Sequence, residues 1–301
     1  MFNTLTNSAR IDFTLVPAGP LLVRASTSGL DPALADQEFQ RTWHQGRSTV
    51  YLPGSGLKGA LRSHCERLLR AAGRFACDPT SRGQDACHQR TLPPAGTATD
   101  PDHPHANQCP ACFTFGSLQL AGRFRAADAY PPEELWEATN RTEVRTGVGL
   151  DRRTQAPVPG ALFDLEAVVD GGFRASLGGE SFSLWQLGLV LAALADLDAG
   201  LLQLGGGKSR GMGTVRVRDA AIELRFLDRA QGQLCGARRH ALDAHDYGLP
   251  ENDVLPAGDG AEEGQSGLFR TVGYRGDAVA GLGERLASGP LARYLGLGGG
   301  A

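Results

Sequence analysis

Residues suited to binding phosphate cluster in the segment Gly205–Gly213, which reads Gly-Gly-Gly-Lys-Ser-Arg-Gly-Met-Gly. Glycine adopts positive φ readily and lets a backbone approach a ligand closely. Lys208 and Arg210 add positive charge, and Ser209 adds a hydroxyl group. Because exposed N–H groups and cations together attract anions, this segment could form a cradle for phosphate.

The segment is not a nucleotide-binding P-loop, although its Gly-Lys-Ser part resembles the end of one. That motif has the form Gly-x4-Gly-Lys-Ser/Thr and lies between a buried strand and a helix. Leu202 stands where its first glycine belongs. Apolar spacing over 184–194 predicts a helix before the segment, and alternation over 214–218 predicts a strand after it. The plain alternative to a phosphate cradle is a glycine-rich turn with two solvated cations.

A group of cysteines indicates a metal site. Cys109 and Cys112 form a Cys-x2-Cys pair, and Cys77 and Cys87 precede them in the same irregular segment, 73–117. A segment this polar cannot bury enough apolar surface to offset its ordering entropy, whereas Zn²⁺ ligation by four thiolates can. Two disulfides, or reduced free thiols, are the alternatives. Three histidines are competing ligands: His88, His103 and His105.

Carboxylates that could hold a divalent cation or transfer a proton lie in the loop 26–48. They are Asp31, Asp36 and Glu38. His44, near the end of this loop, could act as a general base. Ordinary solvated side chains are the alternative explanation for all four residues.

The periodicity of apolar residues predicts the elements that position these groups. Strands are expected at 11–15 with a continuation at 21–24, at 49–52, at 118–125, at 162–169 and at 215–224, and helices at 56–72 and from 184, with Ser55 and Ser183 as N-caps. The core order strand, helix, strand, strand, helix, strand predicts an α+β protein with a ferredoxin-like sheet and helices on one face. Residues 140–159 resemble a long hairpin.

Four ordered segments resemble the RAMP superfamily, which supplies the backbone subunits of type III CRISPR effector complexes. The first is residues 51–62, Tyr-Leu-Pro-Gly-Ser-Gly-Leu-Lys-Gly-Ala-Leu-Arg, similar to the conserved helix start of the family. Residues 148–154 and 160–166 resemble its "IDR-x-T … G-x-LF-x-x-E" segment, and Gly205–Gly213 resembles its C-terminal glycine-rich loop. Cys-x2-Cys before Phe-Thr-Phe-Gly-Ser is also similar to the family.

The resemblance implies a ferredoxin-like (RRM-like) domain over 1–226 with two insertions. These are a zinc-binding segment at 73–117 and a hairpin at 140–159 that is similar to the thumb of the family. Residues 227–301 are expected to form a loop-rich C-terminal appendage.

The resemblance also implies a function: binding of guide CRISPR RNA along its backbone, and cleavage of complementary target RNA with Mg²⁺ or Mn²⁺. The family's catalytic aspartate matches Asp36 first and Asp31 second. Structural Zn²⁺ at Cys77, Cys87, Cys109 and Cys112 is expected from the cysteines themselves. The expected partners are the guide, the target, other effector subunits and copies of the chain itself. The expected RNA-binding residues are Arg41, Ser55, Lys58, Arg62, Arg152, Gly206, Gly207, Lys208, Ser209 and Arg210.

Two other functions fit the same sequence. One is a scaffold that binds guide RNA without catalysis. The other is a metal-independent endoribonuclease that processes the guide, for which His64 or His44 would be the acid–base residue.

Composition sets broader limits. The net charge of −3 is unfavourable for a nucleic-acid binder, but cations concentrate at 41–70 and 205–218 and acids at 243–263. No run of about 18 apolar residues could span a membrane, and residues 1–10 contain no apolar signal core. We therefore expect a cytoplasmic protein.

Overall fold

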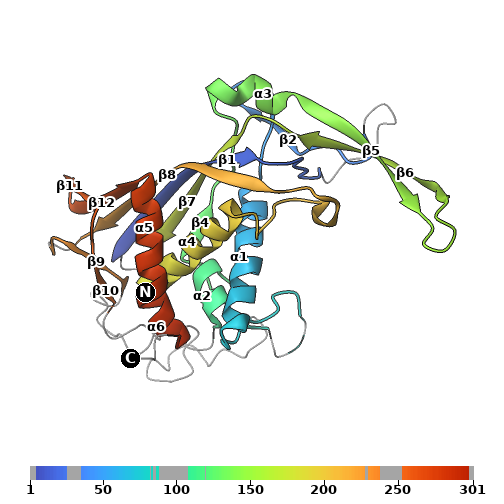
Figure 1. Cartoon of the computed structure of the whole chain (residues 1–301). Coiled ribbons are helices and arrows are strands. Elements are labelled where there is room, and N and C mark those ends of the chain that lie inside the picture. The colour runs from blue at the N-terminus through green and yellow to red at the C-terminus, as the bar shows by residue number, and fades with distance from the viewer. Residues whose placement is uncertain are drawn as a thin grey trace.

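A six-stranded antiparallel sheet forms the centre of the computed structural model, in the order β11-β12-β8-β1-β7-β4 (Figure 1). The structure describes residues 5–25, 35–81, 83, 86–87, 108–118, 120–227, 230–237 and 253–297. The sheet strands are β1 (Asn7–Pro17), β4 (Phe124–Ala126), β7 (Phe173–Glu180), β8 (Val215–Phe226), β11 (Glu262–Ser266) and β12 (Phe269–Arg275). The α+β class predicted from the sequence is therefore confirmed.

Three long helices lie on one face of this sheet (Figure 1): α1 (Gly54–Ala71), α4 (Leu184–Asp198) and α5 (Asp277–Leu286). Alternation along β1 explains the arrangement, because Ile11, Phe13 and Leu15 are buried while Arg10 is exposed. The apolar side chains thus form a core between the sheet and the helices.

Smaller elements surround this core. The short helices are α2 (Pro110–Phe115), α3 (Trp136–Asn140) and α6 (Ala292–Leu295). Three two-stranded ribbons pair β2 (Arg41–His44) with β3 (Arg47–Val50), β5 (Thr142–Leu150) with β6 (Pro157–Val168), and β9 (Gln233–Cys235) with β10 (Val254–Pro256). None of the helices described is long and apolar enough to cross a membrane.

The two long helices of the predicted core begin differently from each other. Ser183 occupies the N-cap position of α4, as expected, and its N–H donates to Gln186 Oε1 at 3.0 Å in the manner of a capping box. Ser55, by contrast, was wrongly predicted to cap α1, because the helix begins one residue earlier, at Gly54. The Gly54 N–H donates to Asp128 Oδ1 at 2.7 Å, so a carboxylate from a distant segment caps the helix. A Cβ at Gly54 would lie 2.4 Å from a backbone oxygen, which explains the glycine.

The prediction that 162–169 forms a core strand was wrong. Residues 157–168 form β6, which pairs with β5, and β7 takes the place beside β1 instead. Leu165 and Ala167 are buried in a separate small cluster with Leu22 and Met212, whereas Val168 at the end of β6 belongs to the main core.

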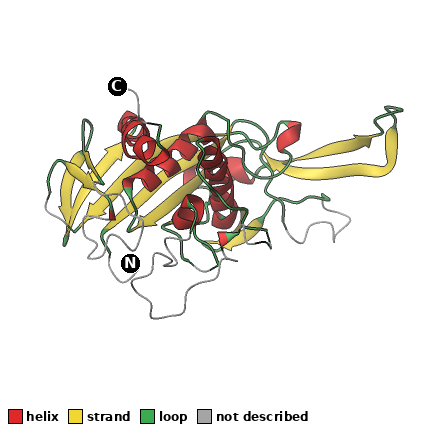
Figure 2. Ribbon diagram, turned by 90° about the horizontal axis from the view of Figure 1, so that it is seen from below, coloured by secondary structure: helices red, strands yellow, loops and turns green. Residues whose placement is uncertain are grey.

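The β5–β6 hairpin projects away from the sheet and helices (Figure 2). It extends further along the chain than the predicted 140–159, since its second strand continues to Val168. Asp151 organises the tip, where its Oδ1 accepts hydrogen bonds from the N–H groups of Arg153 (3.0 Å) and Thr154 (2.7 Å). These bonds lower the pKa of the Asp151 carboxyl.

The C-terminal part contains more regular structure than the loop-rich appendage that we expected. Strands β11 and β12 extend the main sheet beyond β8. Helix α5 packs on α4, where a Cβ at Gly188 would lie 3.2 Å from Leu286 Cβ. Residues 253–297 therefore share the core of the preceding domain.

Candidate functional site

The four predicted ligand cysteines lie together. Cys77, Cys87, Cys109 and Cys112 are all buried, and their sulfur atoms lie within 4.8 Å of one another. Cys112 Sγ is 3.4 Å and Cys109 Sγ 3.7 Å from Cys77 Sγ. Tetrahedral zinc with Zn–S bonds of about 2.3 Å requires sulfur separations of about 3.8 Å. The cluster therefore could hold a metal such as zinc.

Backbone N–H groups donate hydrogen bonds to two of these sulfur atoms. Cys109 precedes α2, and its Sγ accepts the N–H of Cys112 at 3.4 Å, while the Cys109 N–H donates to Cys87 Sγ at 3.2 Å. Such donors stabilise thiolates and orient them toward a metal. A hydrogen bond from Cys112 lowers the pKa of the Cys109 thiol. All six cysteines are free, so the disulfide alternative is wrong, and the competing histidines lie outside the described residues.

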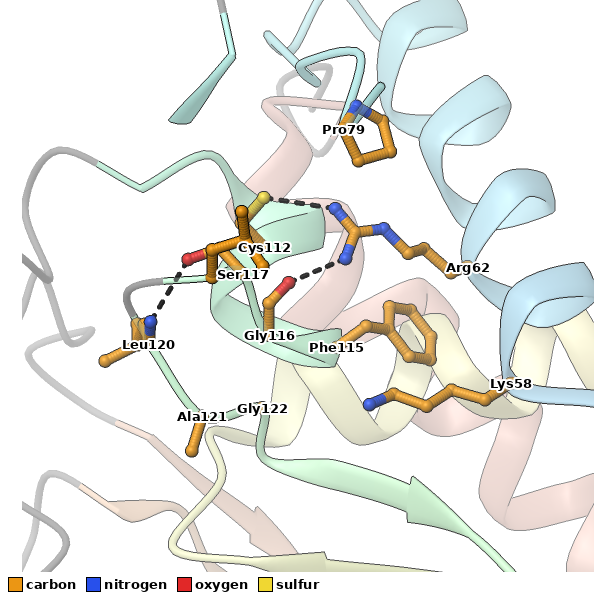
Figure 3. A pocket seen from close by; sticks show the side chains of 11 residues that line it. Lys58, Arg62, Pro79, Cys112, Phe115, Gly116, Ser117, Leu120, Ala121 and Gly122 are labelled. Atoms are coloured by element: carbon orange, nitrogen blue, oxygen red, sulfur yellow. Dashed lines mark hydrogen bonds between the residues drawn. The ribbon is translucent and has the colours of Figure 1, made fainter. Parts of the chain in front are cut away.

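The predicted RNA-binding cations Lys58 and Arg62 lie one turn apart on α1. Both line a pocket of about 540 Å³ against residues 116–118 and 120–122 (Figure 3). Burial, together with the positive charge of Arg62, lowers the pKa of the Lys58 amine. Ser55 is exposed in the first turn of the helix, where the Asp128 carboxylate already satisfies one terminal N–H group.

The glycine segment runs from α4 to β8, which confirms the predicted helix-to-strand direction and excludes a P-loop. Its backbone docks on the loop after β1: Gly206 N–H donates to Leu22 O at 2.8 Å, and Gly213 N–H donates to Pro20 O at 2.8 Å. Between these anchors, Lys208–Arg210 form one exposed 3₁₀ turn flanked by glycines with positive φ. Gly207, one of these two flanking glycines, is half-buried.

Three predicted site residues from distant segments contact residues 163–166 of strand β6. We call this region, where the β5–β6 hairpin leaves the sheet and helices, the junction. Asp36 Oδ2 accepts the Asp164 N–H at 2.9 Å. Arg41 forms an ion pair with Glu166, and the Arg210 guanidinium lies 5.0 Å from the centre of the Phe163 ring.

Glu166 is the centre of this junction. Its carboxylate accepts hydrogen bonds from the Phe39 N–H at 2.8 Å and the Thr142 hydroxyl at 2.6 Å, besides the Arg41 contact. Although burial acts in the opposite direction, these bonds lower the pKa of the Glu166 carboxyl. Glu166 lies within the family-like segment 160–166, but the sequence alone indicates no role for it. Its hydrogen-bond partners lie 24 to 127 residues away from it in the chain.

The remaining predicted residues lie apart from this junction. Arg152 is exposed at the hairpin tip, and Asp31 lies outside the described residues. Within the described residues, the cysteines are the only group of three or more potential metal ligands. Asp36 is therefore not part of a preformed carboxylate cluster among those residues.

The two histidines differ in their surroundings. His64 is buried between α1 and α4, where its Nε2 lies 2.5 Å from Asp196 Oδ2 and its Nδ1 lies 2.7 Å from Arg67. It therefore has a structural role in joining the helices. His44 is half-buried and stacks on Tyr130, with ring centres 3.8 Å apart.

The family model described as the RAMP superfamily matches residues 15–216, which is more than half of the chain. No curated protein matches.

Proposed function

Because the chain belongs to the RAMP superfamily, and is at that level a CRISPR-associated RNA-binding subunit, we propose that it is a backbone subunit of a type III effector complex. In this role it binds guide CRISPR RNA and cleaves complementary target RNA with a divalent metal. Its partners are the guide, the target, other effector subunits and further copies of itself along the guide.

The observation that carries the proposal is the junction at strand β6. An acid, Asp36, and two cations, Arg41 and Arg210, come from segments far apart in the chain and contact residues 163–166. The junction would offer a surface that binds the RNA backbone, and the β5–β6 hairpin that projects from it could insert between base pairs. We therefore place the guide along the junction and the hairpin between successive groups of base pairs.

The proposal includes a ferredoxin-like core. It is supported by the order β8-β1-β7-β4 within the sheet, with α1 connecting β1 to β4 and α4 connecting β7 to β8. Each helix thus crosses over one intervening strand, as in a split β-α-β unit.

Guide binding would depend on phosphate and shape, since the expected RNA-binding residues are cations, a hydroxyl and glycines. Lys58 would contact phosphate in the pocket beside α1, near Ser55. Gly206, Gly207, Lys208, Ser209 and Arg210 would do so in the glycine segment, and Arg152 at the hairpin tip. Zinc at the four cysteines has a structural role in this proposal.

Target cleavage would centre on Asp36. A single carboxylate supplies one protein ligand, so Mg²⁺ or Mn²⁺ would take its other oxygen ligands from RNA phosphate and water. The Asp164 N–H fixes one carboxylate oxygen of Asp36, which orients the exposed side chain at the junction.

The test is cleavage of a complementary target by complexes assembled on a guide RNA, with and without Mg²⁺. Asp36→Ala should abolish cleavage and leave guide and target binding unchanged. Glu38→Ala, in the same loop, is the matched control and should reduce cleavage less than Asp36→Ala does. Cleavage at the wild-type rate by Asp36→Ala complexes would contradict the catalytic assignment. If the wild-type complex itself never cuts the target, the chain would be a scaffold that binds guide RNA without catalysis.

One observation favours a second candidate. The stack of His44 on Tyr130, beside the start of α1, places two acid–base groups together, as a metal-independent guide-processing endoribonuclease would require. Cleavage of guide precursor in EDTA that is lost in His44→Ala would support this function.

A further inference from the structure

The pocket beside α1 combines two cations with the segment that carries the metal ligands. Lys58 and Arg62 form one wall, and Cys112, Gly116 and Gly122 lie on the opposite wall (Figure 3). Phe115 and Leu120 contribute apolar lining. The two cations differ completely in how they are paired, and this difference assigns them separate roles.

Lys58 is the cation that remains available to a ligand. No carboxylate among the described residues lies within 4.0 Å of its amine, and its half-buried side chain points toward Gly122 (Figure 3). A desolvated amine beside a second positive charge is unfavourable until an anion joins it. The pocket is therefore suited to an anion such as a phosphate group.

Arg62 already uses three of its five N–H donors within the protein. Its Nε donates to Glu66 Oε1 at 2.8 Å, Nη1 donates to Gly116 O at 2.6 Å, and Nη2 donates to Cys112 Sγ at 3.1 Å. Its planar guanidinium thus donates to a carboxylate, a backbone carbonyl and a sulfur atom at the same time. An RNA phosphate could bind Arg62 only through the two remaining donors, or by displacing one of these partners.

Cys112 is joined to the pocket in two independent ways. Its sulfur atom accepts from Arg62, and its carbonyl accepts the Gly116 N–H at 2.7 Å. A Zn²⁺ ion held by four thiolates carries a net charge of about −2, which the Arg62 guanidinium partly offsets. Fixing Cys112 as a metal ligand would thus fix both Arg62 and the facing wall.

We propose that Arg62 is a positioning residue that couples the four-cysteine site to RNA binding at Lys58, rather than a residue that binds RNA itself. The inference rests on the proposed function, because the anion that we expect at Lys58 is an RNA phosphate. Metal at the cysteines holds Gly116 in place through Arg62, and residues 116–118 and 120–122 complete the pocket around Lys58.

The link between Arg62 and the metal ligands can be tested without RNA. Co²⁺ in place of Zn²⁺ gives thiolate-to-metal absorption bands that report on each sulfur ligand. Arg62→Met should shift these bands while the metal content stays at one ion per chain. Arg67→Met is the matched control, since Arg67 lies on the same helix but bonds His64, and it should leave the bands unchanged. Identical spectra in all three proteins would overturn the coupling.

The RNA affinity of the full, metal-loaded chain tests whether Arg62 supports RNA binding at Lys58. With a labelled single-stranded oligonucleotide, Lys58→Gln and Arg62→Met should each weaken binding roughly tenfold. The double variant should bind no more weakly than the weaker single variant, since both changes remove the same contact. Losses that multiply would show that Arg62 contacts RNA directly and would overturn the proposal. A wild-type chain that binds no RNA would instead contradict the proposed function, and the cobalt spectra would still decide the coupling.

Discussion

Gly205 and Gly211 provide a matched test of why the segment Gly205–Gly213 contains so many glycines. Both have positive φ, at +71° and +78°, but their surroundings differ. A Cβ at Gly205 would lie 2.1 Å from Leu22 O, whereas a Cβ at Gly211 would meet nothing within 4 Å. Alanine at either position carries a conformational cost of about 1–2 kcal/mol.

Gly205→Ala carries two further costs. The backbone must move away from Leu22 O, which costs about 1–3 kcal/mol in a packed site. The movement also breaks the bond from the Gly206 N–H to that oxygen, worth about 1 kcal/mol. We therefore expect Gly205→Ala to lower the free energy of unfolding by about 3–6 kcal/mol, and Gly211→Ala by about 1–2 kcal/mol.

Urea denaturation followed by circular dichroism measures the difference. With a slope of about 2–3 kcal/mol per molar urea, the midpoint of Gly205→Ala should lie about 1 M below that of Gly211→Ala. Equal midpoints would refute the reasoning that Gly205 is required by its contact with Leu22, and would leave positive φ as the sole reason for glycine at both positions.

Two further predictions concern metal and pH. Cys109→Ala should reduce tightly bound zinc, measured by elemental analysis, from about one ion per chain to near zero, whereas Cys235→Ala should retain the ion; equal zinc in both variants would contradict the site. Burial raises the pKa of Asp253 from 3.8 to about 6, although the Leu184 N–H donates a 2.9 Å hydrogen bond to its carboxylate. The stability that this carboxyl contributes is therefore fully present below pH 4 and is lost as pH rises through 6. Asp253→Asn should therefore raise the free energy of unfolding at pH 7.5 by up to about 3 kcal/mol and leave it unchanged near pH 4, and a pH-independent difference between the two proteins would contradict this explanation.

Local patterns predicted the helices and the grouping of the four cysteines well. The apolar spacing over 184–194 identified α4, and the Ser183 cap followed from its chemistry alone. The cysteines could be grouped because polar sequence around them left metal binding as the remaining source of stability. Both inferences depend on residues close together in the chain, where local physical chemistry is sufficient.

Features that depend on distant partners could not be predicted. The apolar residues of β6 suggested a core strand, but Leu165 is buried by Met212, whose position no periodicity indicates. Ser55 had the chemistry of a cap, yet Asp128 arrives from another segment and occupies that role. Arg62 donates to Gly116 O and Cys112 Sγ, which lie 54 and 50 residues further along the chain, and no local pattern indicates these partners.

The cysteine cluster has a consequence for how the chain can change over evolution. Metal ligation would close the segment between Cys87 and Cys109 at both ends, so its ends would stay joined whatever its length. The entropic cost of closing such a loop rises slowly, by about 0.6 kcal/mol for each doubling of length. Insertions between these two cysteines should therefore be tolerated far better than insertions within α1 or β6, and this segment can acquire new contacts without loss of the fold.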